Sequence, residues 1–122
     1  MRYAEPHPET AQLELTDVMA ALSDPTRVGL VRLLADGAER GWGELRVPVA
    51  KSTLSHHLKV LRAAGLTQTR EEGTRCYVRL RRADVAARFP QLLDAVLGAA
   101  DRDEVGAHVR LAPDAANPAV TR

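Results

Sequence analysis

Aromatic residues are scarce in this chain of 122 residues, which has two Tyr, one Phe and one Trp. A hydrophobic core must therefore be built from aliphatic side chains. Apolar residues make up 45% of the sequence, so such a core is possible. The length fits one small domain and not comfortably two. A small aliphatic core suggests that a partner chain completes it.

Cysteine is almost absent as well, since Cys76 is the only one. One thiol excludes a disulfide framework and a cysteine-rich metal cluster within the chain. No apolar run is long enough for a membrane span. No apolar stretch follows the arginine near the start, so we expect no signal peptide. The chain is therefore expected to be cytoplasmic.

The net charge is only +1, but the charges are unevenly distributed. Residues 46–82 carry nine basic and two acidic side chains, a net charge of +7. Residues 1–45 and 83–122 carry net charges of −4 and −2. A basic block between acidic ends is typical of a surface that binds a polyanion such as DNA. From charge alone, a solvated arginine-rich surface is an equal alternative.

The spacing of apolar residues predicts a mainly helical chain with one small hairpin. The hairpin covers residues 67–80 and turns near Gly73, because Cys76, Val78 and Leu80 alternate with more polar side chains. Expected helices cover residues 10–22, 24–35, 41–46, 51–65, 82–89 and 90–100. In the second helix, Asp24 is expected to cap the start, and Gly29 is expected to weaken the middle.

The segment 51–65 is the most informative of these helices. Three leucines share one face of a helical wheel, and small polar, His and Lys side chains share the other. The polar face carries Ser52, His56, Lys59 and Ala63, with Ser55 and Arg62 at its edge. Ser52 is the expected N-cap, and Gly65 is the expected residue after the C-cap. A helix that packs with one face and offers short polar groups on the other suits a DNA major groove.

The order of these elements is that of a winged helix-turn-helix. The chain also resembles the arsenic-repressor (ArsR/SmtB) family of bacterial transcriptional regulators over residues 13–97. The resemblance is carried by three separated segments that occur in the family's order: Ala21–Arg27, Ser52–Leu66 and Glu72–Leu80. The resemblance implies a homodimeric repressor that binds a palindromic operator and is released by a metal ion or another signal. We therefore expect a mainly α fold with a small β-hairpin. A flexible arm (1–9) precedes the domain (10–112), and a disordered tail (113–122) follows it.

The resemblance also assigns roles to particular residues. The DNA-binding set comprises Ser52, Thr53, Ser55, His56, His57, Lys59, Arg62, Arg70, Arg75 and Arg79. For His57, which lies nearer the packed side of its helix, a structural role is equally open. The dimer interface is expected on the first and last helices, through Leu15, Val18, Met19, Leu22, Leu93, Val96 and Leu97.

The soft-metal motif of the family is absent. Many members have Glu-Leu-Cys-Val-Cys where this chain has Glu44-Leu-Arg-Val-Pro48, so both thiolates are replaced and arsenite or cadmium sensing is not expected.

Candidate nickel or zinc ligands are His7, Glu104 and His108, of which the last two would lie one helical turn apart. An exposed acidic helix end is the favoured interpretation of these residues. Cys76 is expected to be structural rather than a redox switch.

The sequence also separates classes of function. Ser55, His56 and His57 are neighbours on one helix and point about 100° apart, so they cannot align as nucleophile and base. With no glycine-rich phosphate loop either, no enzyme is expected. We predict a DNA-binding transcriptional regulator, a repressor located at operator DNA in the bacterial nucleoid, with its effector unidentified. A nickel- or zinc-responsive regulator, and a protein-interaction module that acts with a co-regulator protein, are the alternatives.

Overall fold

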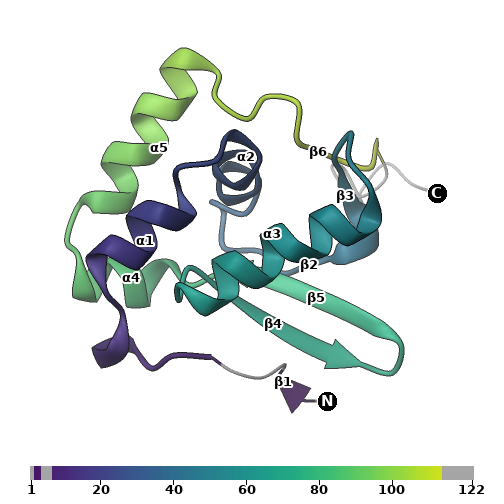
Figure 1. Cartoon of the computed structure of the whole chain (residues 1–122), viewed down its shortest axis with the longest axis horizontal. Helices are drawn as coiled ribbons and strands as arrows, with labels where there is room; N and C mark the ends of the chain where they lie inside the picture. Colours follow the sequence, from purple (N-terminus) through teal and green to yellow (C-terminus); the bar gives the residue numbers. More distant parts are fainter. Residues whose placement is uncertain (1, 4–6, 114–122) are drawn as a thin grey trace.

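The computed structural model describes residues 2–3 and 7–113 (Figure 1). Its α-helices are α1 (Leu15–Ala21), α2 (Pro25–Leu33), α3 (Lys51–Ala63), α4 (Arg82–Arg88) and α5 (Leu92–Asp103). Two short 3₁₀ helices are η1 (Thr10–Gln12) and η2 (Trp42–Glu44). The strands are β1 (Arg2–Tyr3), β2 (Arg40–Gly41), β3 (Leu45–Arg46), β4 (Thr67–Glu72), β5 (Arg75–Leu80) and β6 (Arg110–Leu111).

The strands form two small antiparallel sheets. The larger sheet has the order β1-β4-β5-β2, and β3 pairs with β6 in the smaller one. The hairpin β4–β5 pairs from Thr67 with Leu80 to Glu72 with Arg75, and Gly73 takes a φ of +62° in its turn. The predicted hairpin is therefore confirmed. Figure 1 shows it projecting from the helices as a wing. We call β4–β5 the wing below.

The core is aliphatic, as the shortage of aromatic residues required. It takes side chains from the helices, from both strands of the wing and from the loops between them. Fully buried members include Val18, Leu30, Val31, Leu34, Leu58, Leu61, Leu66, Val78 and Val85. Each such side chain contributes about 1.5–3 kcal/mol relative to an exposed one. Among the described residues, no helix has both the length and the apolar character that crossing a bilayer requires.

Helix α2 begins as the sequence predicted. Oδ1 of Asp24 accepts hydrogen bonds from the N–H groups of Thr26 (2.8 Å) and Arg27 (3.1 Å), and Pro25 occupies the first helical position. Partial burial of Asp24 opposes ionisation, but these two N–H groups, together with electrostatic attraction to His57 and Arg27, hold the pKa of the carboxyl below its ordinary value. The cap therefore remains charged at neutral pH.

The two ends of α3 differ in how well they were predicted. Its N-cap is Ala50, whose carbonyl oxygen accepts from the N–H of Leu54 at 3.0 Å, and no side chain caps this end. Ser52 was the expected cap, and that prediction is wrong, because the helix begins at Lys51. At the other end Gly65 takes a φ of +87°, its N–H donates to Arg62, and the N–H of Leu66 donates to Leu61. This is the expected glycine-terminated cap.

The N-terminal segment differs from the expected arm and single helix. Arg2 and Tyr3 pair with Glu71 and Arg70 of the wing as strand β1. Nε2 of His7 accepts a hydrogen bond from the N–H of Thr69 at 3.0 Å. The expected helix over 10–22 is split into η1 and α1, because Leu13 leaves the helical path and its side chain is buried, with 2% exposed. Of the expected tail, all but Pro113 lies outside the described residues.

Candidate nucleic-acid interface

Helix α3 buries one face and exposes the other. It packs against α1, α2 and β4. The buried face holds His57, Leu58 and Leu61. The exposed face holds Lys51, Ser52, Thr53, His56, Lys59 and Ala63, while Ser55 and Arg62 are half-buried at its edge. The polar face that the sequence predicted is therefore the exposed one, and His57 lies on the buried side, as its place nearer the packed side of the helix indicated.

His57 joins α3 to α2. Its Nδ1 lies 3.1 Å from Nη1 of Arg27, and arginine can only donate, so Nδ1 accepts and the neutral ring carries its proton on Nε2. The side chain is 9% exposed, and this burial is the main reason why its pKa is lowered. The charge of Asp24 opposes that shift, whereas the charges of Arg27 and His56 add to it. Of the two roles left open by the sequence, this geometry supports the structural one.

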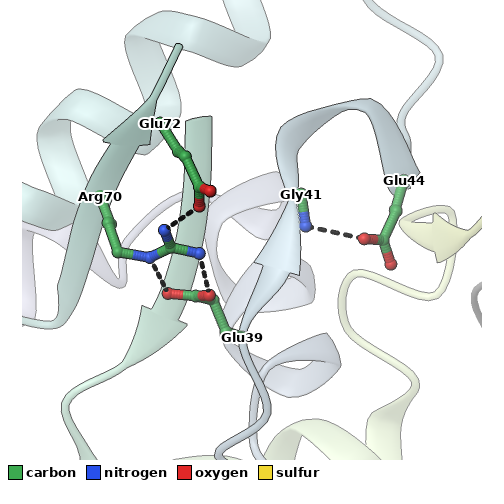
Figure 2. A network of polar contacts seen from close by, with 5 residues as sticks. All are labelled: Glu39, Gly41, Glu44, Arg70 and Glu72. Atoms are coloured by element: carbon green, nitrogen blue, oxygen red, sulfur yellow. Dashed lines mark hydrogen bonds and ion pairs between the residues drawn. The ribbon is translucent and has the colours of Figure 1, made fainter. Parts of the chain in front are cut away.

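Arg70 of the wing is occupied by carboxylates (Figure 2). Its Nε and Nη2 donate to the two carboxylate oxygens of Glu39 at 3.0 and 2.6 Å, and its Nη1 donates to Glu72. Its guanidinium carbon also lies 4.4 Å from the centroid of the Tyr77 ring. The hydrogen bonds to both carboxylates raise the pKa of Arg70 further above its ordinary value. Arg70 was expected to contact DNA, but its charge is already neutralised, and it ties the wing to the loop before β2.

Other cations remain available on the same part of the surface. Arg75 and Arg79 of the wing are exposed, as are Lys51 and Lys59 of α3. Within residues 7–113, none of the four takes part in a hydrogen bond or ion pair of its side chain. The exposed face of α3 and the wing thus combine short polar groups with exposed positive charge, of which that of Arg79 also acts on the carboxylates of Glu39 and Asp84. This combination suits phosphate contacts beside base contacts.

Comparison with known proteins gives the family. Residues 24–69 match the model of the family described as "Bacterial regulatory protein, arsR family". The chain is 38% identical over 80 residues to the uncharacterized HTH-type transcriptional regulator YceK of Bacillus subtilis (strain 168), an alignment that covers 63% of this chain and 80% of that protein. The chain belongs to the ArsR family. It is also 35% identical over 100 residues to the biofilm growth-associated repressor of Agrobacterium fabrum (strain C58), covering 80% and 84% of the two chains.

Membership of the ArsR family defines the parts of the fold. The matched residues run from the cap of α2 into β4, so they contain the helix-turn-helix and the start of the wing. The predicted winged helix-turn-helix class, mainly α with a small antiparallel sheet, is confirmed. The chain is a DNA-binding transcriptional regulator, in which α3 takes the place of the recognition helix.

The candidate metal ligands of this ArsR-family chain are held apart. His7 is bonded to Thr69 on β4, whereas Nε2 of His108 lies 2.9 Å from the hydroxyl of Thr26 on α2. Helix α5 ends at Asp103, and Glu104 has a φ of +56°, so the expected helical spacing of Glu104 and His108 is wrong. In the part of the chain that the structure describes, no three His, Cys, Asp or Glu side chains converge on a point where a metal ion would fit.

The expected interface residues divide into buried and exposed groups. Val18 and Leu93 are 0% and 4% exposed and belong to the core of their own chain. Leu22, Val96 and Leu97 are half-buried. Leu15 and Met19 on α1 are 44% and 56% exposed, which is unusual for large apolar side chains in this molecule. The sequence pattern could not make this distinction, because a buried stripe and an interface stripe have the same spacing.

Proposed function

We propose that the chain is a sequence-specific repressor that binds a palindromic operator as a homodimer. The observation that carries the proposal is the exposed face of α3, where small hydroxyl groups and one imidazole lie beside two lysines. Short side chains let a helix enter the major groove closely and reach base edges. A two-fold dimer presents two such helices about 34 Å apart, one turn of DNA. The name of the Agrobacterium relative supports repression as the direction of control.

Each group then has a distinct role at the operator. His56 is exposed on the polar face of α3 and reads base edges. Lys59 and the wing residues Arg75 and Arg79 neutralise phosphates and set the affinity for any sequence. Leu15 and Met19 give α1 an apolar surface that a second copy of the chain covers, which accounts for their exposure in a single chain.

Fluorescence anisotropy with operator DNA, selected from a random library, tests this proposal. His56→Ala should weaken binding to the selected site by about 1–3 kcal/mol and leave binding to unrelated DNA nearly unchanged, since it removes a base contact. Arg75→Ala should weaken binding to both DNAs and flatten the salt dependence by about one phosphate contact. Arg102→Ala, an exposed arginine on α5, is the matched control and should have little effect.

The outcomes separate the alternatives. Equal binding by wild type and both variants would rule out α3 and the wing as the DNA surface. An absence of DNA affinity at every ionic strength would favour a protein-interaction module that acts with a co-regulator. Analytical ultracentrifugation measures the dimer directly, and a monomer at micromolar concentration would contradict that part of the proposal.

A further inference from the structure

The chain that follows α5 returns to the helix-turn-helix and passes beside the start of α3. Figure 1 shows β6 next to β3, near the end of α3 at which the helix begins. The two strands pair antiparallel, with Leu45 opposite Leu111 and Arg46 opposite Arg110. Strand β3 ends at Arg46 and α3 begins at Lys51, so β6 lies close to the recognition helix.

Contacts with α2 and η2 fix the path of this returning segment. Nη1 of Arg32 on α2 donates to the carbonyl oxygen of Val105 at 2.6 Å, and Val109 is 6% exposed within the core. Just beyond the paired residues, the N–H of Ala112 donates to the carbonyl oxygen of Glu44 at 2.7 Å. The position of β6 is therefore supported on both sides of its short pairing with β3.

Strand alternation puts the leucines and the arginines of this pair on opposite faces. Leu45 is buried, and Leu111 is half-buried and packs against the core. Arg46 and Arg110 are both exposed. Directly opposite residues of an antiparallel pair have Cβ atoms about 5 Å apart, and like charges at such positions are destabilising. The outer face of the small sheet thus holds two positive charges at close range.

No carboxylate neutralises these two arginines among the residues that the structure describes. Nη1 of Arg46 donates to backbone carbonyl oxygens, those of Gly43 and Leu45, so its guanidinium keeps its full charge. Arg46 also lines a pocket of about 410 Å³ together with Lys51 and Ser55 of α3. The positive charge of the β3–β6 pair is therefore continuous with the start of the recognition helix.

We propose that Arg46 and Arg110 bind one phosphate of the DNA backbone beside the base contacts of α3. This assignment rests on the proposed function, which places α3 in the major groove. Guanidinium groups pair with phosphate oxygens through charge-assisted hydrogen bonds, often two at a time. The backbone of DNA suits this place because Lys51 and Ser55 extend the same surface onto the helix that reads the bases. We call Arg46 and Arg110 the phosphate clamp.

The phosphate clamp links DNA binding to the pairing of β3 with β6. In the free protein, repulsion between the two arginines weakens this pairing. A phosphate held between them offsets the repulsion, so bound DNA stabilises the pair. By linkage, a change that DNA favours in the protein raises the affinity for DNA to the same extent.

Anisotropy titrations of full-length variants at several salt concentrations test the phosphate clamp. Arg110→Gln should weaken binding to operator and to unrelated DNA about tenfold in about 0.1 M salt, and it should reduce the slope of log K against log salt by about 0.9 for each chain bound. Arg110→Lys keeps the charge and should retain most of the affinity. Arg102→Gln, at an exposed position on α5, is the matched control and should have little effect.

Arg110→Glu distinguishes phosphate binding from a structural role of β6. Its carboxylate attracts Arg46 and repels a phosphate. In the free variant, hydrogen exchange of the Ala112 amide should therefore become slower, while the affinity for DNA should fall further than in Arg110→Gln. In the wild type, the same amide should exchange more slowly once operator DNA is bound. A purely structural role would change the pairing and the DNA affinity in the same direction.

The outcomes decide the phosphate clamp and the proposed function separately. A wild-type chain without affinity for DNA would overturn both. If the wild type binds operator DNA and Arg110→Gln matches its affinity and its salt slope, the phosphate clamp is wrong and the proposed function stands. The clamp is also wrong if Arg110→Lys loses as much affinity as Arg110→Gln, or if the Ala112 amide exchanges faster in Arg110→Glu.

Discussion

Replacing Gly29 with alanine should destabilise the domain, although helix propensity alone predicts the opposite. Gly29 lies inside α2, where alanine is favoured over glycine by about 1 kcal/mol. However, a Cβ atom at this position would lie 2.5 Å from the carbonyl oxygen of Gly106 and 2.6 Å from Cγ2 of Val109. Contacts below 3.0 Å are essentially never seen for real Cβ atoms. Either α2 or the segment around Gly106 would have to move.

That segment is tied to α2 in ways that oppose such a movement. Nη1 of Arg32 donates to the carbonyl oxygen of Val105 at 2.6 Å, and the His108 ring bonds to the Thr26 hydroxyl. Val109 is 6% exposed and part of the core. Overpacking a close-packed site costs about 1–3 kcal/mol, and a backbone oxygen as the opposing atom argues for the upper end. After the propensity gain, the free energy of unfolding should fall by about 2 kcal/mol.

Urea unfolding followed by circular dichroism, at one protein concentration, measures this difference. Gly98→Ala is the matched control, because Gly98 lies inside α5 and a Cβ atom there would meet nothing within 4 Å apart from its own stretch of helix. That variant should gain about 1 kcal/mol from propensity alone. If Gly29→Ala were as stable as the wild type while Gly98→Ala gained stability, the close approach of α2 and the Gly106 segment would be refuted.

Two further predictions concern the start of the helix-turn-helix. Asp24→Ala should lower the free energy of unfolding by about 1 kcal/mol, since it removes the cap of α2. Asp24→Asn keeps a capping side chain and should stay close to the wild-type stability in the same urea titrations. Burial holds the pKa of His57 below its ordinary value of 6.5 in the folded protein. The stability that the neutral ring contributes is therefore complete above pH 6.5. It is lost as the pH falls from 6.5 towards the pKa of the folded state. The free energy of unfolding, measured at several pH values, should show this loss in the wild type. The variant His56→Gln, at an exposed position, is the control and should show the same loss. An equally steep loss in His57→Gln would show that His57 is not the source.

Local features of the fold could be predicted because neighbouring residues carry their cause. The cap at Asp24, the glycine stop at Gly65 and the turn at Gly73 follow from which side chains tolerate those backbone conformations. The polar face of α3 follows from helical spacing. Ser52 was misassigned because a capping residue type can equally stand one position inside a helix whose start is determined by its neighbours.

The candidate site depended more on distant pairs. Arg70 was expected to bind phosphate from its type and place in the wing, yet Glu39, 31 positions earlier, neutralises it. The partial signal in the sequence was Glu72, two residues along the same strand and therefore on the same face. The ring of His57 likewise accepts a hydrogen bond from Arg27, 30 positions away. Residue type and periodicity do not identify such partners.

The sequence by itself determined the helix order, the hairpin, the main caps and the polar face of the recognition helix, because each depends on residues within a few positions of one another. Only the tertiary structure decided which cations remain unneutralised, which apolar stripes are core and which are exposed, and why Gly29 must lack a side chain. These properties depend on elements that meet only when the chain has folded.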